Sequence, residues 1–160
     1  MTIENSDAVI RIQMKKRIFA LLIAIPIALF YATNLGDFLH ELTGVPRQIL
    51  SFILLGLYLL FYVYHIVVKS SYLYFCDEES RVVIRFYLLN PFNSKKNSYE
   101  IPERQFVKFR LHKSLYNLRE EIFVYQKMGE TVAQYPPFSI KSLTDSQKQK
   151  LLKSLASHSK

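Results

Sequence analysis

The sequence is poor in the residues on which many catalytic and metal sites depend. Its 160 residues include one cysteine, four glycines and no tryptophan. A single cysteine excludes an internal disulfide and a cysteine-rich metal cage, and four glycines leave little material for a glycine-rich phosphate loop. The four histidines are far apart and form no HExxH motif. We therefore expect no cofactor, no metal site and no catalytic residue, and predict that the protein is not an enzyme.

Apolar residues and basic charge are abundant, but they are unevenly distributed. Half of the chain is apolar, and 21 Lys plus Arg against 13 Asp plus Glu give a net charge of +8. Residues 1–17 carry +2, residues 18–69 sum to zero, and residues 70–160 carry +6. The charged share of 21% is close to the globular average, which excludes wholesale disorder. The length suits one soluble domain, or a smaller domain with a membrane anchor.

Two uncharged stretches predict membrane-spanning helices. Residues 18–36 and 49–68 lack charged side chains, and each would measure about 30 Å as a helix, the thickness of a bilayer core. No small-residue cleavage site follows the first stretch, so we expect it to be retained rather than removed as a signal peptide. The sequence thus predicts a two-helix transmembrane hairpin over residues 18–69, with a short external loop at 37–48.

The distribution of cations predicts the orientation of this hairpin. Four cations precede the first stretch, whereas the loop at 37–48 contains only Arg47. Lys and Arg concentrate on the cytoplasmic side of membrane proteins. We therefore expect a basic cytoplasmic segment at residues 1–17, and both termini on the cytoplasmic side of a bacterial inner membrane.

Each predicted span has a face suited to helix packing. Alanines spaced four apart follow one side of the first span, where a second backbone could approach closely. Polar side chains follow one side of the second span, and such groups usually face protein rather than lipid. These faces either hold the hairpin together or bind a larger membrane protein. The predicted interface comprises Ala20, Ala24, Ala28, Ala32, Ser51, Gly56, Tyr58, Tyr62 and His65.

After residue 70 the pattern changes to alternating apolar and polar residues, which is typical of antiparallel strands. Polar segments at 77–80 and 90–97 predict a turn and a loop. We expect strands at residues 72–76, 81–89, 99–102, 106–113, 120–127 and 130–135.

A C-terminal helix is expected from Thr144 onwards. Thr144 and Gln147 have the spacing of a capping box, and Leu151, Leu152 and Leu155 give the helix an apolar stripe. The domain at 70–160 is therefore predicted to be α+β, a small antiparallel β barrel or bent sheet closed by the C-terminal helix.

This plan resembles bacterial membrane proteins in which a helical hairpin precedes a cytoplasmic PH-like domain. The resemblance covers residues 72–157. It rests on the hairpin at 72–89, the segment IPERQFVKF at 101–109 and the segment YPPFSIKSLTDSQKQKLLKSL at 135–155. The resemblance implies a noncatalytic interaction or scaffold domain. It does not transfer a phosphoinositide site, since no compact Lys-x-Arg pocket is present.

The basic residues point to anionic lipid headgroups or an acidic partner protein. A cation near an anionic leaflet contributes about 1 kcal/mol. The candidate contact residues are Arg11, Lys15, Lys16, Arg17, Lys95, Lys96, Lys108 and Arg110. Nucleic acid is disfavoured, because the sequence lacks an aromatic and basic RNA-binding motif.

These observations favour a noncatalytic accessory or scaffold subunit of an inner-membrane complex. Its partner would be a larger integral membrane protein or complex, and self-association stays open. The alternative is a small membrane enzyme or transport component that uses His65, or the cluster Asp37, His40 and Glu41.

Overall fold

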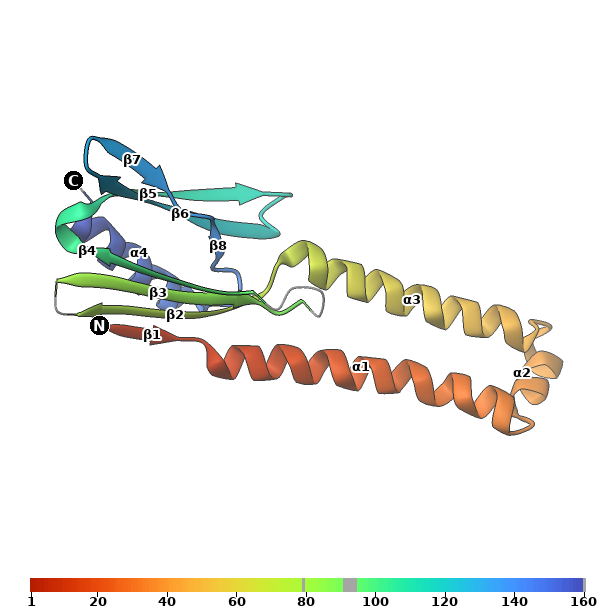
Figure 1. The fold of residues 1–160 in the computed structure, drawn as a ribbon. Coiled ribbons are helices and arrows are strands. Elements are labelled where there is room, and N and C mark those ends of the chain that lie inside the picture. The colour runs from red at the N-terminus through yellow and green to blue at the C-terminus, as the bar shows by residue number, and fades with distance from the viewer. Residues whose placement is uncertain (79, 91–94, 160) are drawn as a thin grey trace. The chain divides into compact units, whose positions relative to one another are not determined.

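The computed structural model describes residues 1–78, 80–90 and 95–159 and divides into two compact units. The sheet unit comprises Met1–Ile10 and Ile66–Lys160, and the helical unit comprises Arg11–His65 (Figure 1). The sequence places boundaries after residues 17 and 69. The structure instead groups the first ten residues with the C-terminal part of the chain.

Three helices occupy the chain between the first strand and the second. They are α1 (Ser6–Ala32), α2 (Leu35–Thr43) and α3 (Arg47–Val68). A bend of 93° separates α1 from α2. Gly36 is needed just after this bend, because a Cβ there would lie 2.7 Å from the carbonyl oxygen of Phe30. Gly44 then ends α2 with a φ of +71°.

The prediction of a two-helix transmembrane hairpin is wrong. Among the helices of the described residues, only α3 is long and apolar enough to span a membrane by itself. The helix α1 meets this length and hydropathy criterion only together with α2, as a bent pair. The reason is the position of the helix ends. Because α1 ends at Ala32, its uncharged part is residues 18–32, about 22 Å long and short of the bilayer core. The predicted external loop is largely the helix α2.

The strands form two antiparallel sheets. The first has the order β1-β2-β3-β4, and the second has the order β5-β6-β7, with β8 also paired to β6. Their bounds are β1 Thr2–Glu4, β2 Ser71–Glu78, β3 Arg81–Leu88, β4 Lys96–Pro102, β5 Phe106–Ser114, β6 Arg119–Met128, β7 Thr131–Gln134 and β8 Phe138–Ser139. The two predicted hairpins are confirmed as β2–β3 and β6–β7. The predicted turn at 77–80 and loop at 90–97 lie partly outside the described residues, at 79 and 91–94.

The predicted closed barrel is also wrong, because both sheets are open. No ladder joins β4 to β5 in the sheets formed by the described residues. The chain leaves β4 at Pro102, and the 3-10 turn η1 (Glu103–Gln105) then separates the two strands. Proline cannot donate to a strand ladder, so pairing ends there.

Both sheets and the C-terminal helix α4 (Asp145–His158) contribute to one hydrophobic core. The capping box is confirmed, since Thr144 Oγ1 accepts from the Gln147 amide and the Gln147 side chain accepts from the Thr144 amide. Leu151 and Leu155 of α4 are fully buried. The largest fully buried side chains from the sheets and connecting segments are Phe75, Phe106, Phe138, Leu73, Ile84, Ile101, Ile122 and Ile140.

The strand β1 was not expected from the sequence. Buried Asn5 holds it in place, because its Nδ2 donates to the Ser71 carbonyl at 2.9 Å and its Oδ1 accepts from the Leu73 amide at 2.8 Å. Residues on either side of the three helices are thereby joined in one sheet.

Candidate functional site

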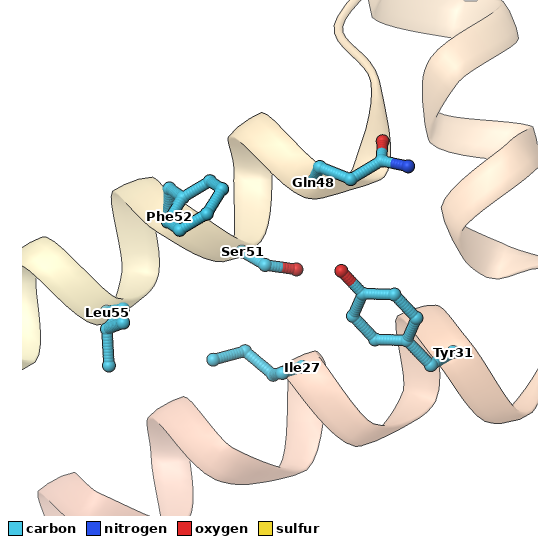
Figure 2. Close-up of a pocket in the computed structure, with 6 residues that line it drawn as sticks. All are labelled: Ile27, Tyr31, Gln48, Ser51, Phe52 and Leu55. Carbon is cyan, nitrogen blue, oxygen red and sulfur yellow. The ribbon is translucent and has the colours of Figure 1, made fainter.

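Two helices of the helical unit line a hollow of about 350 Å³. Ile27 and Tyr31 come from α1, and the other residues come from α3 (Figure 2). The α3 residues are Gln48, Ser51, Phe52 and Leu55. The walls are mostly apolar, with a few hydroxyl and amide groups. A hollow of this size and lining suits a bulky apolar side chain or an acyl chain.

Polar groups and one cation gather where α3 begins. Ser51 Oγ donates to the Arg47 carbonyl at 2.9 Å, and Figure 2 shows the hydroxyls of Ser51 and Tyr31 pointing toward one another. The guanidinium carbon of Arg47 lies 5.5 Å from the centroid of the Tyr31 ring, and its Nη1 lies 3.8 Å from Asp37 Oδ1. The hollow therefore has a polar, cationic end.

Aromatic rings join the two helices further along. The ring centroids of Phe19 and Phe61 lie 4.1 Å apart, and His65 packs edge-on against Phe61 at 4.6 Å. Tyr58 and Tyr62 stack at 6.1 Å. The predicted polar residues of α3 thus lie on a half-buried face together with Phe61.

The alanine stripe does not line the hollow. Ala24, Ala28 and Ala32 are exposed and Ala20 is half-buried. Gly56 is half-buried, and a Cβ added to it would meet no atom within 4 Å. The packed side of α1 carries larger residues one position earlier, which are Phe19, Ile23, Ile27 and Tyr31. Sequence reasoning missed this stripe, although it has the same spacing of four as the alanines.

The predicted basic contact residues are divided between the two units. Four lie on α1 in the helical unit: Arg11, Lys15, Lys16 and Arg17. Four are exposed in the sheet unit: Lys95, Lys96, Lys108 and Arg110. Their role in binding lipid or protein stays a prediction.

The outer face of β5 and β6 combines cations with aromatic rings. Arg110, His112, Phe123, Tyr125 and Gln134 line a shallow hollow of about 290 Å³. Lys108 Nζ lies 5.2 Å from the centroid of the Tyr125 ring, a cation–π distance. The register pairs Lys108 with Tyr125 and Arg110 with Phe123, so cations and rings stand side by side across the two strands. This arrangement suits an anionic group.

A second polar cluster fixes the end of α4 to the first sheet. His158 Nε2 lies 2.9 Å from Asp77 Oδ1, and its Nδ1 lies 3.1 Å from Glu103 Oε1. The Ser154 hydroxyl donates to Asp77. Because the serine bonds the carboxylate rather than the imidazole, the histidine is not placed to activate it as a nucleophile. The cluster is a structural contact between α4, β2 and η1.

This cluster should make the stability of the sheet unit depend on pH. Burial disfavours charged His158, but the hydrogen bonds and charges of Asp77 and Glu103 outweigh it and raise the pKa of His158 above 6.5. Burial likewise opposes ionisation of Asp77, while Ser154 and His158 outweigh it and lower the pKa of Asp77 below 3.8. Stabilisation by His158 is full below 6.5 and is lost as pH rises through its raised pKa. Stabilisation by Asp77 is present above 3.8 and is lost as pH falls through its lowered pKa.

We expect the thermal midpoint of the full-length protein in detergent to fall between about pH 5.5 and pH 8.5, and His158→Gln to remove most of that fall. Circular dichroism at the two pH values measures both midpoints. His112→Gln is the matched control, because His112 is exposed on β5, and it should keep the wild-type difference. An undiminished fall in His158→Gln would contradict this assignment.

The alternative sites expected from the sequence lie apart from these features. Asp37, His40 and Glu41 are exposed on α2, and Asp37 faces Arg47. Among the residues that the structure describes, no three His, Cys, Asp or Glu side chains form a cluster suited to a metal ion. Cys76 is half-buried on β2 and accepts a long contact of 3.8 Å from Thr2 Oγ1.

Comparisons with known proteins assign the chain to no family: no family model matches it, and no curated protein or solved structure matches it significantly. The resemblance to membrane proteins with a PH-like domain therefore stays a prediction from the sequence.

Proposed function

We propose that the protein is a noncatalytic accessory or scaffold subunit of a bacterial inner-membrane complex. The observation that supports this proposal most strongly is the length, composition and exposure of α3. This helix carries no charged side chain after Arg47, it is long enough to span a bilayer, and almost none of its apolar stretch is buried within the chain.

Exposed apolar side chains surround much of α3. Phe52, Leu57 and Leu60 are all exposed, as are many of their neighbours. A soluble protein rarely leaves so large an apolar surface in contact with water. Lipid and the apolar surface of a membrane partner both satisfy these side chains, so we assign α3 to the membrane.

The sheet pairing supports the proposal that both ends of the chain lie on the same side of the membrane. Thr2 pairs with Cys76 and Glu4 pairs with Tyr74, so the residues before α1 and after α3 belong to one sheet. They must lie on the same side of a bilayer.

The helical unit offers two features to a membrane partner. One is the hollow between α1 and α3, and the other is the exposed alanine stripe, which a second helix could approach closely. In the sheet unit, the face with Lys108 and Arg110 would contact an acidic part of that partner or anionic lipid.

Purification in a gentle detergent tests the scaffold function. We expect an affinity-tagged full-length chain to retain a larger integral membrane protein at constant stoichiometry, measured by native mass spectrometry and peptide identification. Recovery of the chain alone, from cells in which it is made at its natural level, would contradict the proposal.

A variant that fills the hollow tests where the partner binds. Ser51→Phe places a ring inside the hollow, and we expect it to reduce the retained partner at least tenfold, about 1.4 kcal/mol of binding. Leu60→Phe is the matched control, since residue 60 lies nine residues on, at the opposite side of the helix, and is exposed. Equal retention by the two variants would exclude the hollow as the docking point.

A further inference from the structure

The tip of the β5–β6 hairpin exposes two large apolar side chains. Tyr116 is fully exposed, at 103% of its reference area, and Leu115 is 49% exposed. They occupy adjacent positions in the turn between Ser114 and Arg119. The Tyr116 side chain is not buried in the sheet unit and Leu115 is only half covered, so both present apolar surface to an external surface.

The tip is held in an unusual conformation. Leu115, Tyr116 and Asn117 all have positive φ values, of 51°, 52° and 65°, although none is glycine. Lys141 Nζ donates to the Asn117 carbonyl at 2.9 Å, and the Leu118 amide donates to the Leu115 carbonyl at 3.0 Å. These bonds fix the turn with its apolar side chains pointing outwards.

The same hairpin is bonded to the last turn of α3. Arg119 Nε donates to the Val67 carbonyl at 2.6 Å, which satisfies one of the free carbonyls at the helix end. Lys69, directly after α3, forms an ion pair of 2.9 Å with Glu121. The tip therefore lies within a few residues of the point where α3 ends.

The charges around the tip suit the headgroup region of a membrane. Arg119 and Lys141 flank the turn, and each donates to a backbone carbonyl. Lys113 and Lys69 also lie near it, in ion pairs with Glu120 and Glu121. Tyrosine prefers the membrane interface, where its ring contacts acyl chains and its hydroxyl stays hydrated, and cations beside it meet lipid phosphates.

We infer that Leu115 and Tyr116 insert into the interfacial layer of the bilayer that α3 enters, with phospholipid as their ligand. This inference rests on the proposed membrane attachment through α3. Insertion of the tip would give the sheet unit a membrane contact in addition to its covalent connection to α3. Two contacts would restrict rotation of the sheet unit about the end of α3.

Single-tryptophan fluorescence tests the inference, because the natural chain has no tryptophan. Full-length Tyr116→Trp is reconstituted in phosphatidylcholine and phosphatidylglycerol vesicles, with or without bromine on the acyl chains. Met128→Trp is the matched control. The exposed fraction of Met128 equals that of Leu115. Met128 lies at the other end of β6, about 30 Å from the tip.

We expect tryptophan at position 116 to emit at shorter wavelength than in water and to lose about half of its intensity to brominated lipid, and tryptophan at 128 to change little. Water-like, unquenched emission at 116 would overturn the inference. A blue shift without quenching would also overturn it, since the tip would then contact protein. Equal quenching at both positions would show a sheet unit lying flat on the surface, with no selective insertion of the tip.

Alkaline carbonate extraction separates this failure from failure of the membrane attachment. Protein that resists extraction but shows no quenching at 116 refutes only the inserted tip. Protein that carbonate releases refutes the attachment through α3 and the inserted tip together.

Discussion

Leu57→Asp should remove the protein from the carbonate-resistant membrane fraction. Leu57 lies at the middle of α3 and is exposed. A carboxylate at the centre of a membrane helix costs about 3 kcal/mol, roughly a hundredfold in partitioning. Immunoblotting of the membrane and soluble fractions after carbonate treatment measures the effect.

The conservative control at this position is Leu57→Met, which keeps an apolar side chain and should leave the membrane fraction unchanged. The same pair of variants distinguishes lipid from water around α3. If α3 were a solvent-exposed helix, the aspartate at an exposed position would be tolerated, and both variants would fractionate like the natural protein. That result would exclude a membrane location for α3.

Leu151→Ala should destabilise the sheet unit by about 2–5 kcal/mol, because it removes a fully buried side chain and leaves a cavity that neighbouring residues only partly fill. Leu151 links α4 to the core formed by both sheets. The denaturant midpoint of the full-length protein, followed by circular dichroism in detergent, should fall accordingly.

The matched control is Leu152→Ala, one residue further along the same helix. Leu152 is half-buried against the core, so the same truncation should cost clearly less. Because both variants gain the same alanine, helix propensity cancels in the comparison. Equal losses at the two positions would mean that α4 does not pack on the core through the face described.

Local patterns predicted much of the sheet unit correctly. The capping box depends only on Thr144 and Gln147, three positions apart at the first turn of α4, and the structure contains it. The β2–β3 hairpin follows from alternation on both sides of a polar turn. Such features depend on neighbours in sequence, so one sequence suffices to find them.

Features that depend on distant parts of the chain were missed or wrong. The uncharged stretch from residue 18 to residue 36 suggested a full span, but the helix ends at Ala32 and turns by 93°. Barrel closure required β5 to pair with β4, and the turn after Pro102 separates them. Neither hydropathy nor alternation reports where a helix ends or which strands become neighbours.

In the candidate site, too, local sequence patterns did not report which residues come into contact. Two stripes with a spacing of four run along α1, one of alanines and one of larger residues. The rule that small residues permit close packing selected the alanines, whereas Phe19 and Tyr31 belong to the side that meets α3. The tip at Tyr116 carries no sequence motif, and only its exposure and backbone conformation distinguish it.

The long-range pairing of β1 also has a consequence for the order of folding. Thr2 pairs with Cys76, so β1 leaves the ribosome well before its partner strand and must remain unpaired while the three helices are made. Closing so long a loop costs entropy, and pairing between distant strands is slow. We therefore expect the three helices to form first. The edge of the first sheet, although it precedes them in the chain, should be among the last parts of the protein to form.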